Sequence, residues 1–174
     1  MNNLDTVDDE FEQIIEPILQ NSEVQKMDIY MQHCDVSCLE HCKNVSYYTY
    51  KICKKLGLDY KSATRAAMLH DFFLYDWRKP RPDNKGFHGF RHPRISLEKA
   101  QQHFELNDKE KDIILKHMWP LTIVPPKYFE SFIITITDKY SAILESYKYF
   151  RKKPGYQKVY ANFVIFLAVL FFKF

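Results

Sequence analysis

Residues 62–72 read SATRAAMLHDF, and the His70-Asp71 pair that ends this alanine-rich apolar run is the most informative feature of the chain. Small side chains such as those of Ala63, Ala66 and Ala67 let a helix pack closely against its neighbours. We predict a helix from Ser62 to about Phe72. At its C-terminal end, adjacent side chains can both reach one site as the helix gives way to a loop.

Further histidines and one aspartate are spread over separate segments on either side of this pair: His41, His92, His117 and Asp138. Imidazole and carboxylate groups are the ligands that hold divalent first-row metals. Taken singly, each residue has an ordinary explanation as a hydrogen-bonded core histidine, a helix-end residue or a solvated carboxylate. The ordered set instead favours convergence of four to six ligands on one or two metal ions.

Local signals place most of these residues on helices. Ser37-Cys38-Leu39-Glu40 is a capping box that opens a helix running to Leu56-Gly57. His92-Pro93 is typical of a helix start, and Asn107 to Glu110 resembles a second N-terminal cap. The helix after Asn107 should stop at Trp119-Pro120. The inward face of the first helix is expected to carry His41, Val45, Tyr48 and Ile52.

The last long helix is expected to begin near Pro126, and Asp138 lies in its middle. A carboxylate beside small and apolar residues needs a partner, because burying it alone is costly. A metal ion is one such partner. Helical spacing gives this helix the following core face, from which Asp138 is offset: Phe129, Phe132, Ile133, Ile136, Tyr140, Ile143, Leu144 and Tyr147.

The segments that carry the set are Glu40-His41-Cys42, residues 67–71, Arg91-His92-Pro93, residues 115–118 and residues 136–140. Their order over roughly residues 32–147 resembles the HD-domain metal-dependent phosphohydrolases. The resemblance implies an all-α helical bundle in a single domain. The chain lacks the Gly-Tyr-Pro signature of the branch that degrades cyclic di-GMP.

The resemblance also implies a metal site with assigned ligands. Because both middle histidines are present, it implies two divalent ions, drawn from Fe, Mn, Co, Ni or Zn. Asp71 would bridge the ions and serve as the central catalytic residue. His41, His70 and Asp138 would complete one site, and His92 and His117 the other. The ions would acidify a water for attack on phosphorus.

Length and composition agree with one folded domain. The chain has 174 residues, of which 46% are hydrophobic and 16% aromatic, and only 4 are glycine. We divide it into an acidic helical extension (1–31), the HD domain (32–150) and a basic and apolar helical tail packing on the domain (151–174). The extension should pack one apolar face: Phe11, Ile14, Ile15, Ile18 and Leu19.

The stretch after His70-Asp71 is basic, rich in Pro and Gly, and without helical periodicity. We interpret residues 78–94 as a loop over the site that binds substrate phosphate; the alternative is a solvated loop with scattered charges. The residues concerned are Arg78, Lys79, Arg81, Arg91 and Arg94. His33 is a second candidate catalytic residue, able to contact a phosphate or protonate a leaving group. His88 competes with His92 and is kept as a possible outer group.

The predicted function is hydrolysis of a phosphate ester or anhydride, with a nucleotide or dinucleotide as substrate. Two alternatives remain open: a mixed-valence di-iron oxygenase on the same fold, and a non-catalytic metal- or nucleotide-binding sensor. A net charge of +3 argues against a nucleic-acid partner. Cys34, Cys38 and Cys42, expected on one helix face, favour reduced thiols and a cytoplasmic location. The apolar run 163–172 is too short to span a bilayer, which leaves packing, weak surface contact through 159–174 or a homodimer.

Overall fold

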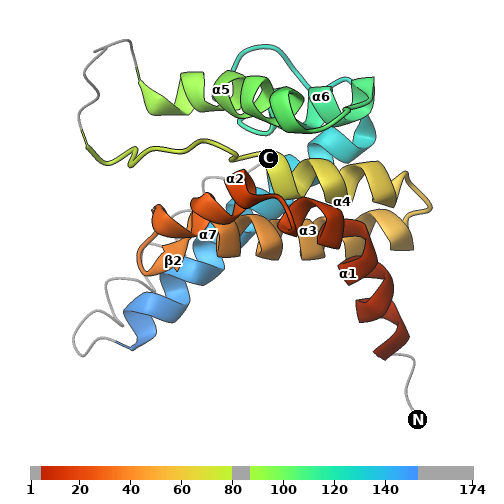
Figure 1. The fold of residues 1–174 in the computed structure, drawn as a ribbon, viewed down its shortest axis with the longest axis horizontal. Coiled ribbons are helices and arrows are strands. Elements are labelled where there is room, and N and C mark those ends of the chain that lie inside the picture. Colours follow the sequence, from red (N-terminus) through yellow and green to blue (C-terminus); the bar gives the residue numbers. More distant parts are fainter. Residues whose placement is uncertain (1–4, 80–86, 153–174) are drawn as a thin grey trace, which may run out of the picture.

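The computed structural model describes residues 5–79 and 87–152, and it confirms an all-α fold (Figure 1). Five helices form its body: α3 (Cys38–Lys55), α4 (Tyr60–Leu69), α5 (His88–His103), α6 (Asp108–Lys116) and α7 (Phe129–Arg151). Before them come α1 (Asp5–Leu19), α2 (Ser22–Gln25), the 3-10 helix η1 (Lys26–Ile29) and a small antiparallel hairpin. Its strands β1 (Met31–His33) and β2 (Val36–Ser37) pair Met31 with Ser37 and His33 with Val36.

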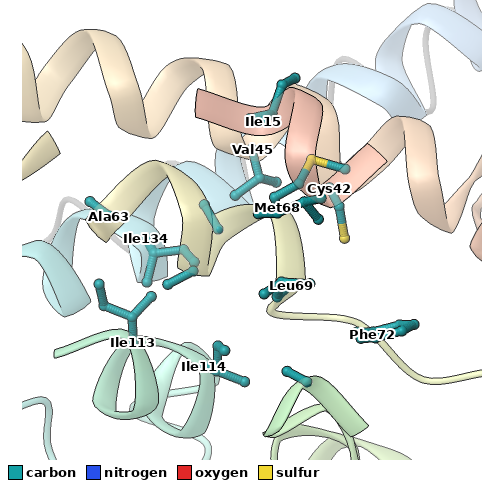
Figure 2. Close-up of a cluster of buried hydrophobic side chains, with 14 of the residues drawn as sticks. Ile15, Cys42, Val45, Ala63, Met68, Leu69, Phe72, Ile113, Ile114 and Ile134 are labelled. Carbon is teal, nitrogen blue, oxygen red and sulfur yellow. The ribbon is translucent and has the colours of Figure 1, made fainter. Parts of the chain in front are cut away.

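A single apolar core joins the helices. In Figure 2, Ile15 of α1 and Cys42 and Val45 of α3 meet Met68 of α4, while Ile113 of α6 lies on the other side of α4. All of these side chains are buried. Because α4 contributes mainly alanines to the contact, it lies close to its neighbours, and its end at Leu69 delivers His70 and Asp71 to the interior.

Three of the predicted helix signals are present: the Ser37 cap, the Gly57 stop and the Asn107 cap. The Ser37 hydroxyl accepts a hydrogen bond from the Glu40 amide at 3.2 Å, and Gly57 has a φ of +67° directly after the helix. Left-handed backbone of this kind favours glycine, so Gly57 ends α3. Asn107 and Glu110 form a reciprocal capping box at the start of α6. The Asn107 amide also donates to Ser62 Oγ at 2.9 Å, which ties α6 to α4.

The predicted core face of α7 is wrong. Among the described residues Phe129 is 70% exposed, Ile136 is 62% exposed and Tyr140 is 48% exposed. The buried face is mainly polar and turns toward α3: Glu130, Ser131, Ile134, Thr135, Thr137, Asp138, Ser141 and Glu145. Except for Ser141, the polar side chains of this face have hydrogen-bond partners that offset their burial; Thr137, for example, bonds Thr49 Oγ1 at 2.8 Å.

The α5 boundary also differs from the prediction. The helix begins at His88, so Pro93 lies inside it rather than at its start. Arg91 and Arg94 therefore belong to a helix and not to a loop. Cys34 lies in the turn between β1 and β2, with a φ of 53°, so it does not share a face with Cys38 and Cys42. Ile52, expected to face inward on α3, is 37% exposed.

The proposed extension shares the core of the domain, since Phe11, Ile15, Ile18, Val24 and Met27 belong to the same buried cluster. Arg81 and residues 153–174 of the proposed tail lie outside the described residues. No helix in the described part of the chain combines the length and apolar composition that crossing a bilayer requires.

Candidate metal centre

Five helices bring the six sequence-predicted ligands into one buried cluster. His41 comes from α3, His70 and Asp71 from the end of α4, and His92 from α5. His117 follows α6, and Asp138 lies on the inward face of α7. All six residues are between 0 and 9% exposed. Buried groups of this polarity need partners that offset their loss of water.

The outer nitrogens of the four imidazoles are each held by an acceptor. His70 Nδ1 lies 2.7 Å from Ala67 O, His92 Nδ1 3.0 Å from His88 O, and His117 Nδ1 2.8 Å from Ile114 O. His41 Nδ1 lies 2.9 Å from Glu145 Oε2. Carbonyl and carboxylate oxygens only accept, so each Nδ1 carries the proton and donates it. In the neutral form every Nε2 therefore presents a lone pair.

Those lone pairs converge. The Nε2 atoms of His92 and His117 are 2.8 Å apart, and when both Nδ1 atoms hold the protons, two lone pairs at this distance repel each other unless a proton or a metal ion lies beside them. His70 Nε2 and Asp71 Oδ1 have no hydrogen-bond partner, although His92 Nε2 lies 3.1 Å from Asp71 Oδ1. A buried set of nitrogen and oxygen donors this close together fits a divalent metal ion, which would take the place of any proton on an Nε2 atom.

The donor atoms fall into groups that share Asp71. One consists of His41, His70 and Asp71, the other of Asp71, His92 and His117, and within each the donor atoms lie within 4.8 Å of one another. Asp138 Oδ1 lies 3.1 Å from His41 Nε2 and 3.8 Å from His70 Nε2, beside the first group. The two groups therefore have the Asp71 carboxylate in common.

Electrostatics in the cluster also favour a cation. Burial tends to raise the pKa of Asp71 and Asp138, but the neighbouring imidazoles outweigh it and hold both carboxyl pKa values well below their usual range. Burial tends to lower the pKa of His41 and His70, yet nearby carboxylates raise both well above 6.5. Burial and the imidazoles of His92 and His70 lower the pKa of His117 to about 3, so that ring is neutral.

Two polar side chains that sequence reasoning missed hold the ligands in place. Glu145 lies one turn beyond Ser141 on the buried face of α7. It accepts a hydrogen bond from His41 Nδ1, and the Asn44 side chain donates a hydrogen bond to its other oxygen at 3.0 Å. Gln32 of β1 donates to Asp71 Oδ2 at 2.5 Å. The spacing of Glu145, seven residues after Asp138, is a helical signal that could have found it. Gln32 has no such signal.

His33 lies against the cluster, with its ring edge-on to that of His41 at 4.9 Å. Burial and the neighbouring His41 lower the pKa of His33, which favours an uncharged ring. His33, His41 and Glu145 also group together, but the His41 atom in that group already bonds Glu145. We therefore interpret this group as a support for His41.

The predicted phosphate-binding residues are less closely tied to the cluster. Arg78 Nε lies 3.1 Å and Lys79 Nζ 3.7 Å from the carboxylate of Asp76, and both basic side chains are largely exposed. Arg94 is exposed on α5, and Arg91 is half-buried on the same helix.

Buried thiols line the cluster on the α3 side. Cys38 Sγ donates to the backbone oxygen of Asp71 at 3.2 Å, and Cys42 Sγ lies 3.7 Å from His70 Nδ1. Burial raises the pKa of both thiols, so they are protonated packing groups at neutral pH.

A family model described as the HD domain matches residues 38–143, a span that runs from the start of α3 into α7 and contains all six residues of the cluster. No curated protein and no solved structure matches the chain.

Proposed function

The chain belongs to the HD-domain family, and on that premise we propose that it hydrolyses a phosphate ester or anhydride of a nucleotide or dinucleotide at a centre of two divalent ions. Membership of this family indicates that the chain belongs to the metal-dependent hydrolase superfamily. The reaction, the substrate class and the number of ions are the parts proposed here.

One observation carries the proposal. Four imidazoles, each with its Nδ1 proton committed to an outward acceptor, direct their Nε2 lone pairs toward Asp71 and Asp138. A site built to store a structural zinc ion needs four ligands and closes around it, whereas six donors sharing one carboxylate suit a pair of ions with room for substrate.

The protein groups have distinct roles in this proposal. His41, His70 and Asp138 would hold one ion, His92 and His117 the other, and Asp71 both. When bound, divalent ions supply Lewis acidity toward phosphoryl oxygens and lower the pKa of a coordinated water. Gln32 fixes the Asp71 carboxylate, and His33 supplies a neutral ring beside His41 that can hydrogen-bond a phosphate oxygen.

The negative charge of the substrate would be neutralised by the basic residues that follow His70-Asp71 in sequence. Guanidinium groups bind phosphate through two parallel hydrogen bonds. Arg91, which is half-buried on α5 one residue before His92, is the member of the proposed phosphate-binding set closest in sequence to a predicted ligand. Arg78, Lys79, Arg81 and Arg94 complete the proposed set.

A phosphate-release screen of nucleotides, dinucleotides and inorganic polyphosphates tests the proposal. The purified chain is stripped with a chelator, reloaded anaerobically with Mn, Fe, Co, Ni or Zn, and compared with Asp71→Asn, which keeps the size of the side chain. We expect metal-dependent release by the wild type and a loss of at least 100-fold in the variant, as is typical when a shared ligand is removed. Full activity in Asp71→Asn contradicts the scheme.

A further inference from the structure

A column of stacked rings runs outward from the metal cluster. His88 lies one helical turn before His92 on α5, and the two rings are 4.5 Å apart and nearly parallel at 16°. Trp77 stacks on His88 at 5.4 Å and 19°. The column therefore begins at a ligand residue and ends, about 10 Å away, at an indole.

The column is held from the side. Phe73 sets its edge against His88 at 4.9 Å and against His92 at 5.8 Å. The Tyr75 hydroxyl lies 3.0 Å from His88 Nδ1. Rings fixed in this way lose little entropy when a further planar group stacks on them. Trp77 nevertheless remains 37% exposed, although an indole gains stability from burial.

We propose that Trp77, with the His88 ring stacked behind it, forms a nucleobase subsite beside the metal cluster. This inference rests on the proposed function, because it assumes that the metal cluster receives a phosphate. A nucleotide joins a planar aromatic base to a phosphate through one ribose, so a base stacked on Trp77 at the outer end of this column could extend its phosphate chain back toward the predicted ligands. Stacking accepts every base, since each has a π-face.

The alternative is that the column only orients His92. Removal of Trp77 would then shift His92, and it would weaken the binding of every substrate and of the metal itself. A subsite predicts the opposite: a selective loss for ligands that carry a base. Comparison of ADP with inorganic pyrophosphate separates these readings, because both carry a diphosphate and only one carries a base.

The variants are Trp77→Ala, Trp77→Phe and the control Phe90→Ala. Phe90 is also aromatic, 55% exposed and close by, but it lies two residues from His88, about 200° around α5, with its ring on Phe87. Titration calorimetry of the Mn-loaded chain measures dissociation constants for ADP and pyrophosphate. A second readout needs no metal: the chain has two tryptophans, so Trp119→Phe leaves Trp77 as the sole indole, and adenosine binding to chelated protein is followed by its fluorescence.

We expect Trp77→Ala to weaken ADP binding about 5- to 100-fold and to change pyrophosphate binding and metal content less than about twofold. Trp77→Phe should retain part of the ADP affinity, Phe90→Ala all of it, and adenosine should quench Trp77. Equal losses for both ligands, no loss for either, or no quenching would overturn the subsite. Quenching and selective ADP loss in a protein that releases no phosphate would uphold the subsite and reject the hydrolase. If the wild type releases phosphate and Trp77→Ala has no effect on ADP binding, the hydrolase is upheld and the subsite is rejected.

Discussion

At the scale of single residues, the orientation of each imidazole is decided by the acceptor behind it. His70, His92 and His117 use backbone carbonyls three or four residues earlier, so their own helices orient them. His41 depends instead on a side chain from another helix, Glu145, which Asn44 holds in turn. A carboxylate in this position fixes the tautomer of a metal-ligating histidine and raises its basicity.

Replacing Glu145 should therefore weaken metal binding without removing a ligand. We expect Glu145→Ala to lower metal affinity about 10- to 100-fold, as is usual for partners of ligating histidines. Glu145→Gln, which keeps an acceptor oxygen but loses the charge, should fall between this variant and the wild type. Competition with a chromogenic chelator at fixed pH measures the change.

Glu130 provides a matched control on the same helix. It is also buried, but it bonds Lys109 and the Asp59 amide near the start of α7. Glu130→Gln should lower thermal stability and leave metal affinity unchanged. Wild-type affinity in Glu145→Ala, or an equal loss in Glu130→Gln, would show that Glu145 has no particular role in holding His41.

At the scale of elements, α7 shows where hydrophobic periodicity misleads. Ile136 and Tyr140 of its apolar stripe are exposed among the described residues, while its polar face is buried. The rule that apolar residues face the core assumes that polar groups gain nothing inside. Asp138 and Glu145 gain histidine partners, and this reverses the face.

Two isoleucines on α7 test this orientation. Ile134 is fully buried, and Ile136 is 62% exposed. We expect Ile134→Ala to lower the free energy of unfolding by about 2–5 kcal/mol, because it leaves a cavity. Ile136→Ala should change it by no more than about 0.5 kcal/mol. Denaturant unfolding of both variants, with identical slopes, gives the comparison.

A large cost at Ile136 would mean that the stripe is covered in solution, by residues outside the described ranges or by a second copy of the chain. Repeating the measurement over a range of protein concentrations separates these cases, because only a dimer makes stability depend on concentration.

At the scale of the whole molecule, the sequence predicted what short-range chemistry encodes. The Ser37 and Asn107 caps, the Gly57 stop and the bundle class follow from neighbouring residues. The order of the six predicted ligands along the chain also predicted that they would lie together in one cluster. Gln32 and Glu145 were not predicted, because each meets its partner across a long stretch of chain. Pro93 predicts a helix start at its own position, whereas α5 begins at His88 and contains the proline.

The whole cluster also determines how stability responds to pH. In the metal-free chain, carboxylates overcome burial and raise the pKa of His41 and His70. A pKa raised on folding stabilises the fold below the unfolded value near 6.5, and this stabilisation is lost as pH rises through the folded value. Metal binding displaces the same protons, so rising pH removes the competitor of the metal.

We therefore expect the melting temperature of chelated protein to fall between pH 6.5 and 8.5, and the gap between metal-loaded and chelated protein to widen over the same range. Differential scanning fluorimetry with saturating Mn measures both curves. His103→Gln is the control, because His103 is exposed and outside the ligand groups, so its curves should match the wild type. A gap that stays constant or narrows would mean that the metal displaces no protons from His41 and His70, and that the cluster does not bind metal as described.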